Sequence, residues 1–165
     1  MTLKEKDYHL QLLGNTNTVY YDCYAPQVLE TFENEFTQND YMVTFDAYEF
    51  TSLCPVTGQP DFAKIYINYI PDKKMLESKS FKLYLFSFRN EKSFHENCVN
   101  TIMNDLVNLL QPKYLEVLGI FAPRGGIAIY PFANYTPTES KYEAFKTKRL
   151  FEVAAKNFDG KKFNS

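Results

Sequence analysis

The chain has 165 residues, of which 45% are hydrophobic and 23% are charged, and its formal net charge is −2. These values predict one globular domain spanning residues 1–165, with a substantial core drawn from 13 tyrosines and 15 phenylalanines. They exclude a broad basic surface for nucleic acid, and no apolar run approaches the length of about 18 residues that predicts a membrane-spanning helix.

The first half of the chain predicts two strands after a polar start. Residues 1–17 are expected to form a loose lead-in, and Thr18–Tyr24 an extended segment. Aromatic and β-branched residues over Tyr41–Phe50 predict a strand. Alternating apolar residues over Phe62–Ile70 predict a second strand, which Pro71 ends.

Helical spacing of apolar residues then replaces the alternating pattern. It predicts a first helix over about Glu77–Asn90 and a second helix that ends at Pro112. Ser93 is expected to cap the second helix, with Glu96 completing a capping box. The apolar face of that helix comprises Val99, Ile102, Met103, Leu106, Leu109 and Leu110.

Two further strands and a peripheral segment complete the predicted order. Tyr114–Ala122 and Ile127–Phe132 are strand-like and are joined by Pro123–Gly126. Residues 133–165 are expected to form a peripheral helix and tail. The order strand, strand, helix, helix, strand, strand predicts an α+β fold with an antiparallel sheet. Because such a sheet has two open edges, we expect neighbouring subunits to cover them in a homo-oligomer.

The turn between the first two predicted strands carries the strongest candidate for chemistry. Pro55 and Pro60 restrict the backbone, and Thr57–Gly58 provides a turn centre. Cys54 and Asp61 therefore lie at the two ends of a stiff loop. A cysteine attacks as the thiolate, and Asp61 is suited to be its proton partner. The alternative is a buried, inert cysteine in an ordinary connector.

The start of the second predicted helix offers a different chemistry. His95 carries the side chain that titrates most readily near neutrality, and Cys98, three residues later, shares its helix face. Together with Cys54 they would form a Cys/His/Cys zinc site, in which the metal would occupy the sulfur of the candidate nucleophile. The simpler alternative is a capping box beside a surface histidine.

Basic residues offer candidate phosphate ligands. Lys79 and Lys82 lie three residues apart near a predicted helix start, where ammonium groups and backbone donors suit a phosphate. Arg124 stands beside Gly125 and Gly126, where the backbone can approach an anion closely. A solvated helix face and a hairpin turn are the simpler alternatives. No Gly-x-Gly-x-x-Gly motif is present, so a nucleotide would bind at a non-Rossmann site.

Cysteine usage and the N-terminus indicate a compartment. Cys23, Cys54 and Cys98 form no even framework, and no Cys-x-x-Cys pair is present. Because residues 1–9 lack the apolar core of a signal peptide, we expect the chain in a reducing cytoplasm, where structural disulfides are rare.

Several of these motifs together resemble one enzyme family. Glu77–Tyr84 matches that family's signature, Glu-(Ser/Leu)-Lys-(Ser/Ala)-hydrophobic-Lys-(Leu/Tyr)-aromatic, at every position. Ser52–Pro55 with Asp61, and Phe94–Glu96, fall where its other motifs belong. Over Tyr41–Phe132 the chain resembles the short, single-module NADPH-dependent 7-cyano-7-deazaguanine reductases, which make a queuosine precursor for tRNA modification.

The resemblance implies a fold, an assembly and an activity. The fold would be a tunnelling fold (ββααββ), in which an antiparallel sheet carries two helices on one face and subunits associate into barrels. The assembly would be a decamer of two pentamers with ligand sites between subunits. NADPH would be the co-substrate and would reduce the substrate's nitrile to an aminomethyl group, with no metal, nucleic acid or membrane expected as a partner.

The resemblance also implies roles for individual residues. Cys54 would add to the nitrile carbon and form a covalent thioimide, and Asp61 would donate the proton that the nitrile nitrogen needs. The residues implied to line the substrate pocket are Leu76, Glu77, Ser78, His95 and Glu96, and His95 would also help to move protons. The residues implied to hold NADPH phosphates are Lys79, Lys82 and Arg124.

Two other functions and one regulatory hypothesis stand beside this interpretation. Cys54, His95 and Cys98 would serve as zinc ligands in a GTP cyclohydrolase-like enzyme on the same fold. A non-enzymatic purine-binding module is the third interpretation. If Cys54 and Cys98 share a pocket, a reversible disulfide between them would protect the nucleophile from over-oxidation.

Overall fold

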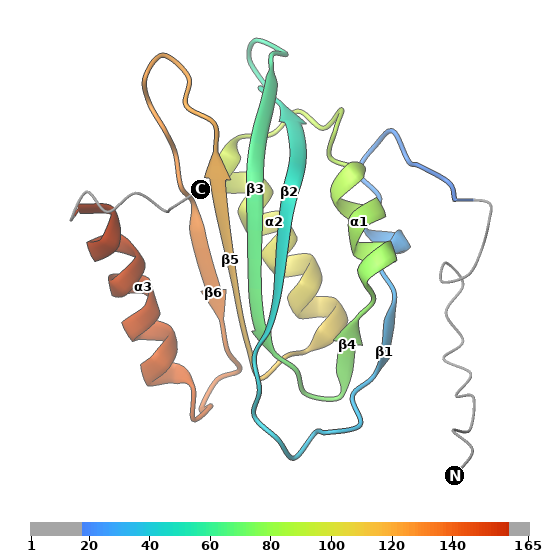
Figure 1. The fold of residues 1–165 in the computed structure, drawn as a ribbon, viewed down its shortest axis with the longest axis vertical. Coiled ribbons are helices and arrows are strands. Elements are labelled where there is room, and N and C mark those ends of the chain that lie inside the picture. The colour runs from blue at the N-terminus through green and yellow to red at the C-terminus, as the bar shows by residue number, and fades with distance from the viewer. Residues whose placement is uncertain (1–17, 159–165) are drawn as a thin grey trace.

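The structure, a computed structural model, describes residues 18–158. Figure 1 shows a sheet with α2 packed behind it, α1 beside β2 and α3 beside β6. The elements in chain order are η1 (Pro26–Val28), β1 (Thr31–Glu33), β2 (Val43–Leu53), β3 (Pro60–Ile70), β4 (Lys74–Leu76), α1 (Ser78–Phe86), α2 (His95–Leu110), β5 (Tyr114–Phe121), β6 (Phe132–Tyr135) and α3 (Glu143–Phe158). Within the described range, no helix is long and apolar enough to cross a membrane.

The main sheet is antiparallel, with strand order β2-β3-β5-β6, and β1 pairs with β4 in a separate two-stranded sheet. In the β2–β3 hairpin, Ser52 lies opposite Asp61 and Leu53 lies opposite Pro60. The loop that begins with Cys54 therefore closes this hairpin at one end of the sheet. Since β2 and β6 are the two edge strands of the described sheet, the sheet does not close into a barrel within one chain.

The core lies between this sheet and the two helices α1 and α2. On β3, Ala63, Ile65, Ile67 and Tyr69 are buried on the helix side, whereas Phe62 is 58% exposed on the other side. Alternate residues of a strand face opposite sides of a sheet, so this pattern gives one apolar face. Each fully buried isoleucine contributes about 1.5–3 kcal/mol to the free energy of folding.

Gly119 allows α2 to approach β5 closely. A Cβ atom at this position would lie 2.8 Å from the Cγ2 atom of Val99 on α2 and 2.8 Å from the ring of Phe121. Real Cβ atoms do not come this close to a neighbour, so any side chain here would push α2 away from the sheet. Gly119 therefore determines how closely the first turn of α2 lies to Phe121.

α3 packs on the opposite face of the sheet through a buried carboxylate. Glu116 and Gly119 lie at odd spacing on β5, so the Glu116 side chain points away from α2. Arg149 of α3 donates to the Glu116 carboxylate from Nε at 2.9 Å and from Nη2 at 2.8 Å. The Tyr114 hydroxyl (2.7 Å) and the Asn68 side-chain amide (2.8 Å) also donate to it. Four donors thus tie α3, β3 and β5 together.

The predicted α+β class, the antiparallel sheet and the order of its elements are confirmed, with changes at several boundaries. Thr18–Tyr24 joins no strand, and the short pair β1 and β4 has no counterpart in the prediction. The last predicted strand, 127–132, is displaced to β6 at 132–135. Arg124 and Ile127 form the turn there, so residues 127–131 lead back toward β5 before regular pairing with Leu118 begins.

The two helix boundaries near the site also differ from prediction. α1 ends at Phe86, because the hydroxyl of the next residue, Ser87, donates a hydrogen bond to the Tyr84 carbonyl. The same hydroxyl accepts a hydrogen bond from the Ala25 N–H, which ties the end of α1 to the start of η1. Ser93 does not cap α2: the N-cap is Phe94, without a side-chain cap hydrogen bond. The Ser93 N–H instead donates to the Leu53 carbonyl at 3.0 Å. The capping-box prediction was wrong because this segment pairs with the end of β2.

Candidate active site

The Cys54 loop is closed by its own backbone. The Cys54 N–H donates to the Gln59 carbonyl, and the Gly58 N–H donates to the Cys54 carbonyl, both at 2.9 Å. Gly58 has a φ of 67°, a left-handed conformation that glycine adopts without strain. The Thr57 hydroxyl accepts a hydrogen bond from the Gln59 N–H at 3.3 Å. The stiffness expected from the two prolines is therefore reinforced by a compact hydrogen-bonded turn.

The environment of Cys54 favours the thiolate. Hydrogen bonds from the Thr57 hydroxyl and from the backbone N–H groups of Thr57 and Val56 lower the pKa of the Cys54 thiol to about 7, with a smaller contribution from Arg124. The thiol is half-buried rather than sealed in the core. At neutral pH a large fraction of it is therefore the nucleophilic form.

Asp61 lies beside this loop in a buried position. It is 4% exposed, and its Oδ1 atom lies 2.7 Å from Nη2 of Arg124 and 3.0 Å from Nε2 of His95. The guanidinium that contacts Asp61 also contributes to lowering the pKa of the Cys54 thiol. The structure brings together Cys54, Asp61, His95 and Arg124, which come from the β2–β3 loop, β3, α2 and the turn after β5.

His95 is held in place by its neighbours in the chain and by an aromatic ring. The Leu53 N–H donates to the Glu91 carbonyl at 2.9 Å, so the segment before α2 pairs with the residue that precedes Cys54. The imidazole stacks on Phe121 with ring centroids 3.9 Å apart and an interplanar angle of 12°. Among the described residues, its Nδ1 atom is buried and has no hydrogen-bond partner.

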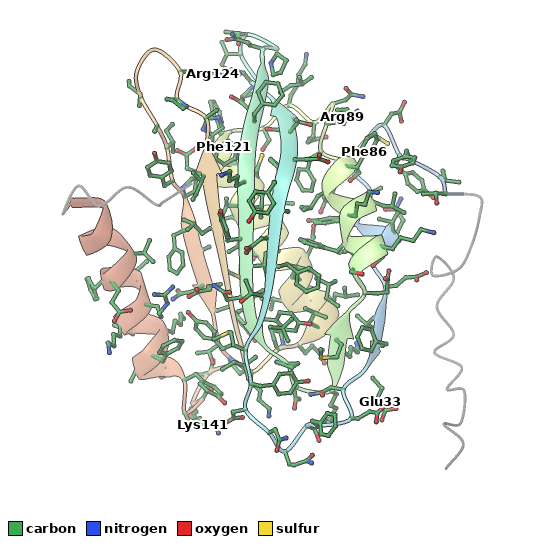
Figure 2. All side chains as sticks on the ribbon, in the orientation of Figure 1. Glu33, Phe86, Arg89, Phe121, Arg124 and Lys141 are labelled. Atoms are coloured by element: carbon green, nitrogen blue, oxygen red, sulfur yellow. The ribbon has the colours of Figure 1, made fainter. Side chains whose placement is uncertain are left out.

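Arg124 lies at the thiol loop. Its Nη2 atom donates to the carbonyls of Gln59 at 2.9 Å and Pro60 at 2.6 Å. Figure 2 labels Arg124 and Phe121 at the same end of the sheet as the β2–β3 hairpin. The family resemblance implies that Arg124 holds NADPH phosphates with Lys79 and Lys82, but its side chain contacts Gln59, Pro60 and Asp61 at the end of the Cys54 loop.

The signature segment, Glu77–Tyr84, begins α1 and lies away from the Cys54 loop. Glu77 is the N-cap of α1, 3% exposed, and its carboxylate accepts from the N–H groups of Lys79 at 2.8 Å and Ser80 at 2.6 Å. Leu76 is buried, and its N–H donates to the Tyr69 hydroxyl. Figure 1 shows this start of α1 next to β4, away from the end of the sheet that carries the β2–β3 turn. One chain alone does not bring Glu77 to Cys54.

A groove of about 410 Å³ runs between α1 and the edge strand β2. Ser78, Lys82 and Arg89 line its helix side, and Thr51, three residues before Cys54, lines its β2 side. The Arg89 guanidinium stacks over Phe86 at 4.2 Å from the ring centroid, and Figure 2 labels both residues at the end of α1. Lys79 is half-buried and does not line this groove. Of the two signature lysines, Lys82 is the one that faces the groove.

The zinc interpretation finds no support in this arrangement. Among the residues that the structure describes, no three His, Cys, Asp or Glu side chains are grouped to hold a metal ion. Cys98 is fully buried in the core, and burial raises the pKa of its thiol. Its side chain lies near those of Ser52 and Ser93. The proposed disulfide between Cys54 and Cys98 stays a prediction.

Sequence reasoning missed two residues of this site. Thr57 was noted only as a turn residue, although a hydroxyl three positions after a cysteine in a tight loop is a signal for thiolate stabilisation. Phe121 was noted only as part of a strand. Nothing in the local sequence indicates that its ring stacks on His95, because the two residues are brought together by the packing of α2 on β5.

Comparison with known proteins identifies the relatives of this chain. The family model described as QueF-like protein matches residues 60–140. A relative from Parabacteroides distasonis is 59% identical over 152 residues, covering 92% of this chain and 96% of its own length. One from Neisseria meningitidis is 63% identical over 143 residues, covering 87% and 91%. Both are named NADPH-dependent 7-cyano-7-deazaguanine reductase.

A solved structure shares the fold. The crystal structure of the archaeosine synthase QueF-Like in the apo form matches with a TM-score of 0.52 at 19% sequence identity. The match covers 60% of this chain and 95% of that one. The similarity supports the tunnelling-fold assignment of the sheet and its helices.

Proposed function

Because the chain belongs to the family of NADPH-dependent 7-cyano-7-deazaguanine reductases, we propose that Cys54 and Asp61 carry its chemistry. The enzyme reduces the nitrile of 7-cyano-7-deazaguanine to the aminomethyl group in queuosine biosynthesis. The zinc-dependent cyclohydrolase and the non-enzymatic module are not favoured by these relatives. The observation that supports the site is the Arg124 guanidinium, which contacts the buried Asp61 carboxyl group at 2.7 Å and the Gln59 and Pro60 carbonyls of the Cys54 loop at 2.9 and 2.6 Å. The pKa of the Cys54 thiol in this loop is lowered to about 7.

Cys54 begins the reaction as a thiolate. Its sulfur forms a bond to the nitrile carbon, one π bond of the triple bond breaks, and the electron pair moves to nitrogen, which takes up a proton. The product of this step is a covalent thioimide on Cys54. Because the thiol is half-buried at the end of a hydrogen-bonded loop, the adduct forms in a place that limits access of water.

Asp61 and His95 handle the proton. Asp61 is the group that passes it to the nitrile nitrogen, and Nε2 of His95, 3.0 Å from Oδ1, is placed to replace it. Stacking on Phe121 fixes the imidazole plane, so the hydrogen bond to Asp61 keeps its direction. Later in the reaction, collapse of the reduced adduct breaks the carbon–sulfur bond and returns Cys54 to the thiolate.

The groove between α1 and β2 fits the phosphates of NADPH. It is lined by Ser78 and Lys82 on α1 and by Arg89 just after it, and it leads along β2 toward Thr51, near the thiol loop. Two exposed cations beside an exposed hydroxyl suit phosphate oxygens. The two hydrides that complete the four-electron reduction come from two molecules of NADPH. Lys79, which donates its backbone N–H to Glu77, supports the same region from the first turn of α1.

The substrate pocket is completed by a second copy of the chain. Glu96 beside His95, and Leu76, Glu77 and Ser78 at the start of α1, are the proposed ring contacts, but they lie on two separate parts of one subunit. Glu77 retains acceptor capacity for a ring N–H, because each carboxylate oxygen accepts more than one hydrogen bond. The proposed enzyme is therefore a cytoplasmic homo-oligomer of single-domain subunits, a decamer of two pentamers by analogy with its family.

Intact-protein mass spectrometry tests the first step without any reductant. Incubation with the nitrile should add the substrate mass to the wild-type chain and to Cys23→Ser, in which only an exposed cysteine is changed. Cys54→Ala should show no adduct and no turnover. An adduct that persists in Cys54→Ala, or stoichiometric zinc in the purified active enzyme, would overturn the proposed mechanism.

NADPH kinetics test the groove. Lys82→Met should raise the KM for NADPH by about tenfold, as expected for loss of one charge-assisted hydrogen bond, while adduct formation with the nitrile stays unchanged. Lys148→Met, an exposed lysine on α3, is the matched control and should change neither quantity. If Lys82→Met leaves the KM for NADPH at the wild-type value, the phosphates do not bind in this groove.

A further inference from the structure

The turn after β5 places one guanidinium against three consecutive residues. Nη2 of Arg124 lies 2.9 Å from the Gln59 carbonyl, 2.6 Å from the Pro60 carbonyl and 2.7 Å from Oδ1 of Asp61. Gln59 also accepts the hydrogen bond from the Cys54 N–H. Arg124 therefore contacts the catalytic loop at the point where it returns to β3, and its side chain is only 32% exposed.

The backbone that carries Arg124 is itself well defined. Arg124 and Ile127 exchange two backbone hydrogen bonds of 3.0 Å across Gly125 and Gly126, whose φ values are 55° and 79°. Two successive positive φ values are the requirement of a tight type I′ turn, which explains the glycine pair. The Ala122 N–H donates to the Phe62 carbonyl at 2.8 Å, so the β3–β5 pairing continues up to this turn. The sheet and its turn therefore fix the position of the backbone that carries the guanidinium.

These contacts serve chemistry as well as shape. The guanidinium joins the buried Asp61 side chain to the carbonyls of Gln59 and Pro60, at the end of the loop that carries Cys54. It also places a positive charge that lowers the pKa of the Cys54 thiol. If Arg124 bound the phosphates of NADPH, the N–H donors of its guanidinium would have to face outward, toward the groove that Lys82 lines.

We infer that Arg124 is a positioning residue of the reductase, which holds the Asp61 carboxyl group and the Cys54 loop in fixed relation, rather than a ligand of NADPH phosphates. This inference rests on the proposed roles of Cys54 and Asp61. It assigns a use to the arginine and the two glycines after β5, in place of the cofactor role that the family resemblance suggested.

The groups that lower the pKa of the Cys54 thiol are identified, so the pH dependence of its alkylation can be interpreted. They are the Thr57 hydroxyl, the backbone N–H groups of Val56 and Thr57, and Arg124 itself. Replacing Arg124 changes one positive charge and leaves the groups of the loop in place. Alkylation by iodoacetamide, followed at the Cys54 peptide by mass spectrometry, reports the thiolate fraction without NADPH or the nitrile.

Two variants separate charge from geometry. In Arg124→Met the alkylation midpoint should move up, by less than loss of the Thr57 hydroxyl would move it, and kcat should fall about 100-fold. The KM for NADPH should change less than about twofold, because under this inference Arg124 does not bind the cofactor. Arg124→Lys should restore most of the alkylation profile but little of kcat, because an ammonium group does not reproduce the planar fork.

Arg89→Met provides the contrast, since Arg89 lines the NADPH groove. It should raise the KM for NADPH and leave the alkylation profile of Cys54 at the wild-type midpoint. If Arg124→Met instead raises the KM for NADPH while its alkylation profile matches wild type, Arg124 is a phosphate ligand and the inference is wrong. A melting temperature within a few degrees of wild type for Arg124→Lys establishes that the loss of kcat is local.

Failure of the proposed function gives a different result. If the wild-type chain forms no adduct with the nitrile, the assigned reaction of Cys54 is wrong, whatever the Arg124 variants show. If the adduct forms in the wild-type chain but the alkylation midpoints of wild type and Arg124→Met coincide, only the inference about Arg124 fails.

Discussion

Two carboxylates on neighbouring strands of this protein are each paired with an arginine, yet they have different surroundings. Glu116 on β5 receives hydrogen bonds from Arg149 through two nitrogens, from Tyr114 and from Asn68. Asp61 on β3 contacts Arg124 and His95 through the same oxygen, Oδ1. Both residues are about 95% buried. The first carboxylate accepts hydrogen bonds from four donors, whereas the second has an arginine and a histidine on one oxygen, beside the loop that carries Cys54.

The difference separates a structural pair from the pair that we propose to be catalytic. A buried carboxylate whose acceptor positions are filled cannot exchange a proton with a substrate without breaking several bonds. One that has an available oxygen, a titratable neighbour and a nucleophile nearby is suited to proton transfer. Burial and an arginine partner alone therefore do not identify a catalytic carboxylate in this family.

The largest expected effect is on turnover. Asp61→Asn should lower kcat by about 10²–10⁴-fold, because the amide cannot deliver the proton to the nitrile nitrogen. Binding of the nitrile, followed by calorimetry, should stay within a few-fold of wild type. A variant with wild-type kcat would show that Asp61 has no role in proton transfer.

The matching change on the other carboxylate should affect stability instead. Glu116→Gln should lower the free energy of unfolding by about 3 kcal/mol, near the low end for a broken buried pair, since Arg149 is 21% exposed. Urea titration at pH 7 measures this loss, and kcat of the folded variant should stay near wild type. A stable but inactive Glu116→Gln would contradict the assignment of Glu116 to structure.

The same pair predicts a pH dependence of stability. Burial raises the pKa of Glu116, but the hydrogen bonds from Arg149, Tyr114 and Asn68 outweigh it, so the folded pKa lies below the unfolded value of about 4.3. Its stabilisation is therefore fully present above pH 4.3 and is lost as the pH falls through the folded pKa. The unfolding free energies of wild type and Glu116→Gln should converge in urea titrations carried out at successively lower pH.

A smaller effect is expected at the thiol. Thr57→Val removes the hydroxyl that contributes most to lowering the pKa of Cys54, so the alkylation midpoint should rise from about 7 by about one pH unit. Activity below this midpoint should fall in proportion to the thiolate fraction. An unchanged midpoint would mean that the backbone N–H groups of the loop are sufficient to stabilise the anion.

The smallest expected effect is on stability, when one of the four hydrogen-bond donors to Glu116 is removed. Tyr114→Phe removes one of them and should lower the free energy of unfolding by about 1 kcal/mol, because the remaining three keep the carboxylate paired. Thermal unfolding measures this change, and kcat should not change. A loss as large as that of Glu116→Gln would show that the Tyr114 hydroxyl is essential to the network.

The sequence by itself determined the order of the main-sheet strands and the helices, the stiff loop between Cys54 and Asp61, and the signature over Glu77–Tyr84. These features depend on local periodicity, proline and glycine, whose effects extend over a few residues. The same local rules failed at Ser93, because a tertiary hydrogen bond to Leu53 competed with the expected cap.

Only the tertiary structure decided the arginine partners of Asp61 and Glu116. Arg124 reaches Asp61 from 63 positions further along the sequence (124 − 61), and Arg149 reaches Glu116 across 33. Such contacts depend on the register of β5 against β3 and on the face of the sheet that α3 covers. Neither the register nor the covered face can be predicted from the pattern of a single segment, because both follow from the packing of the whole core.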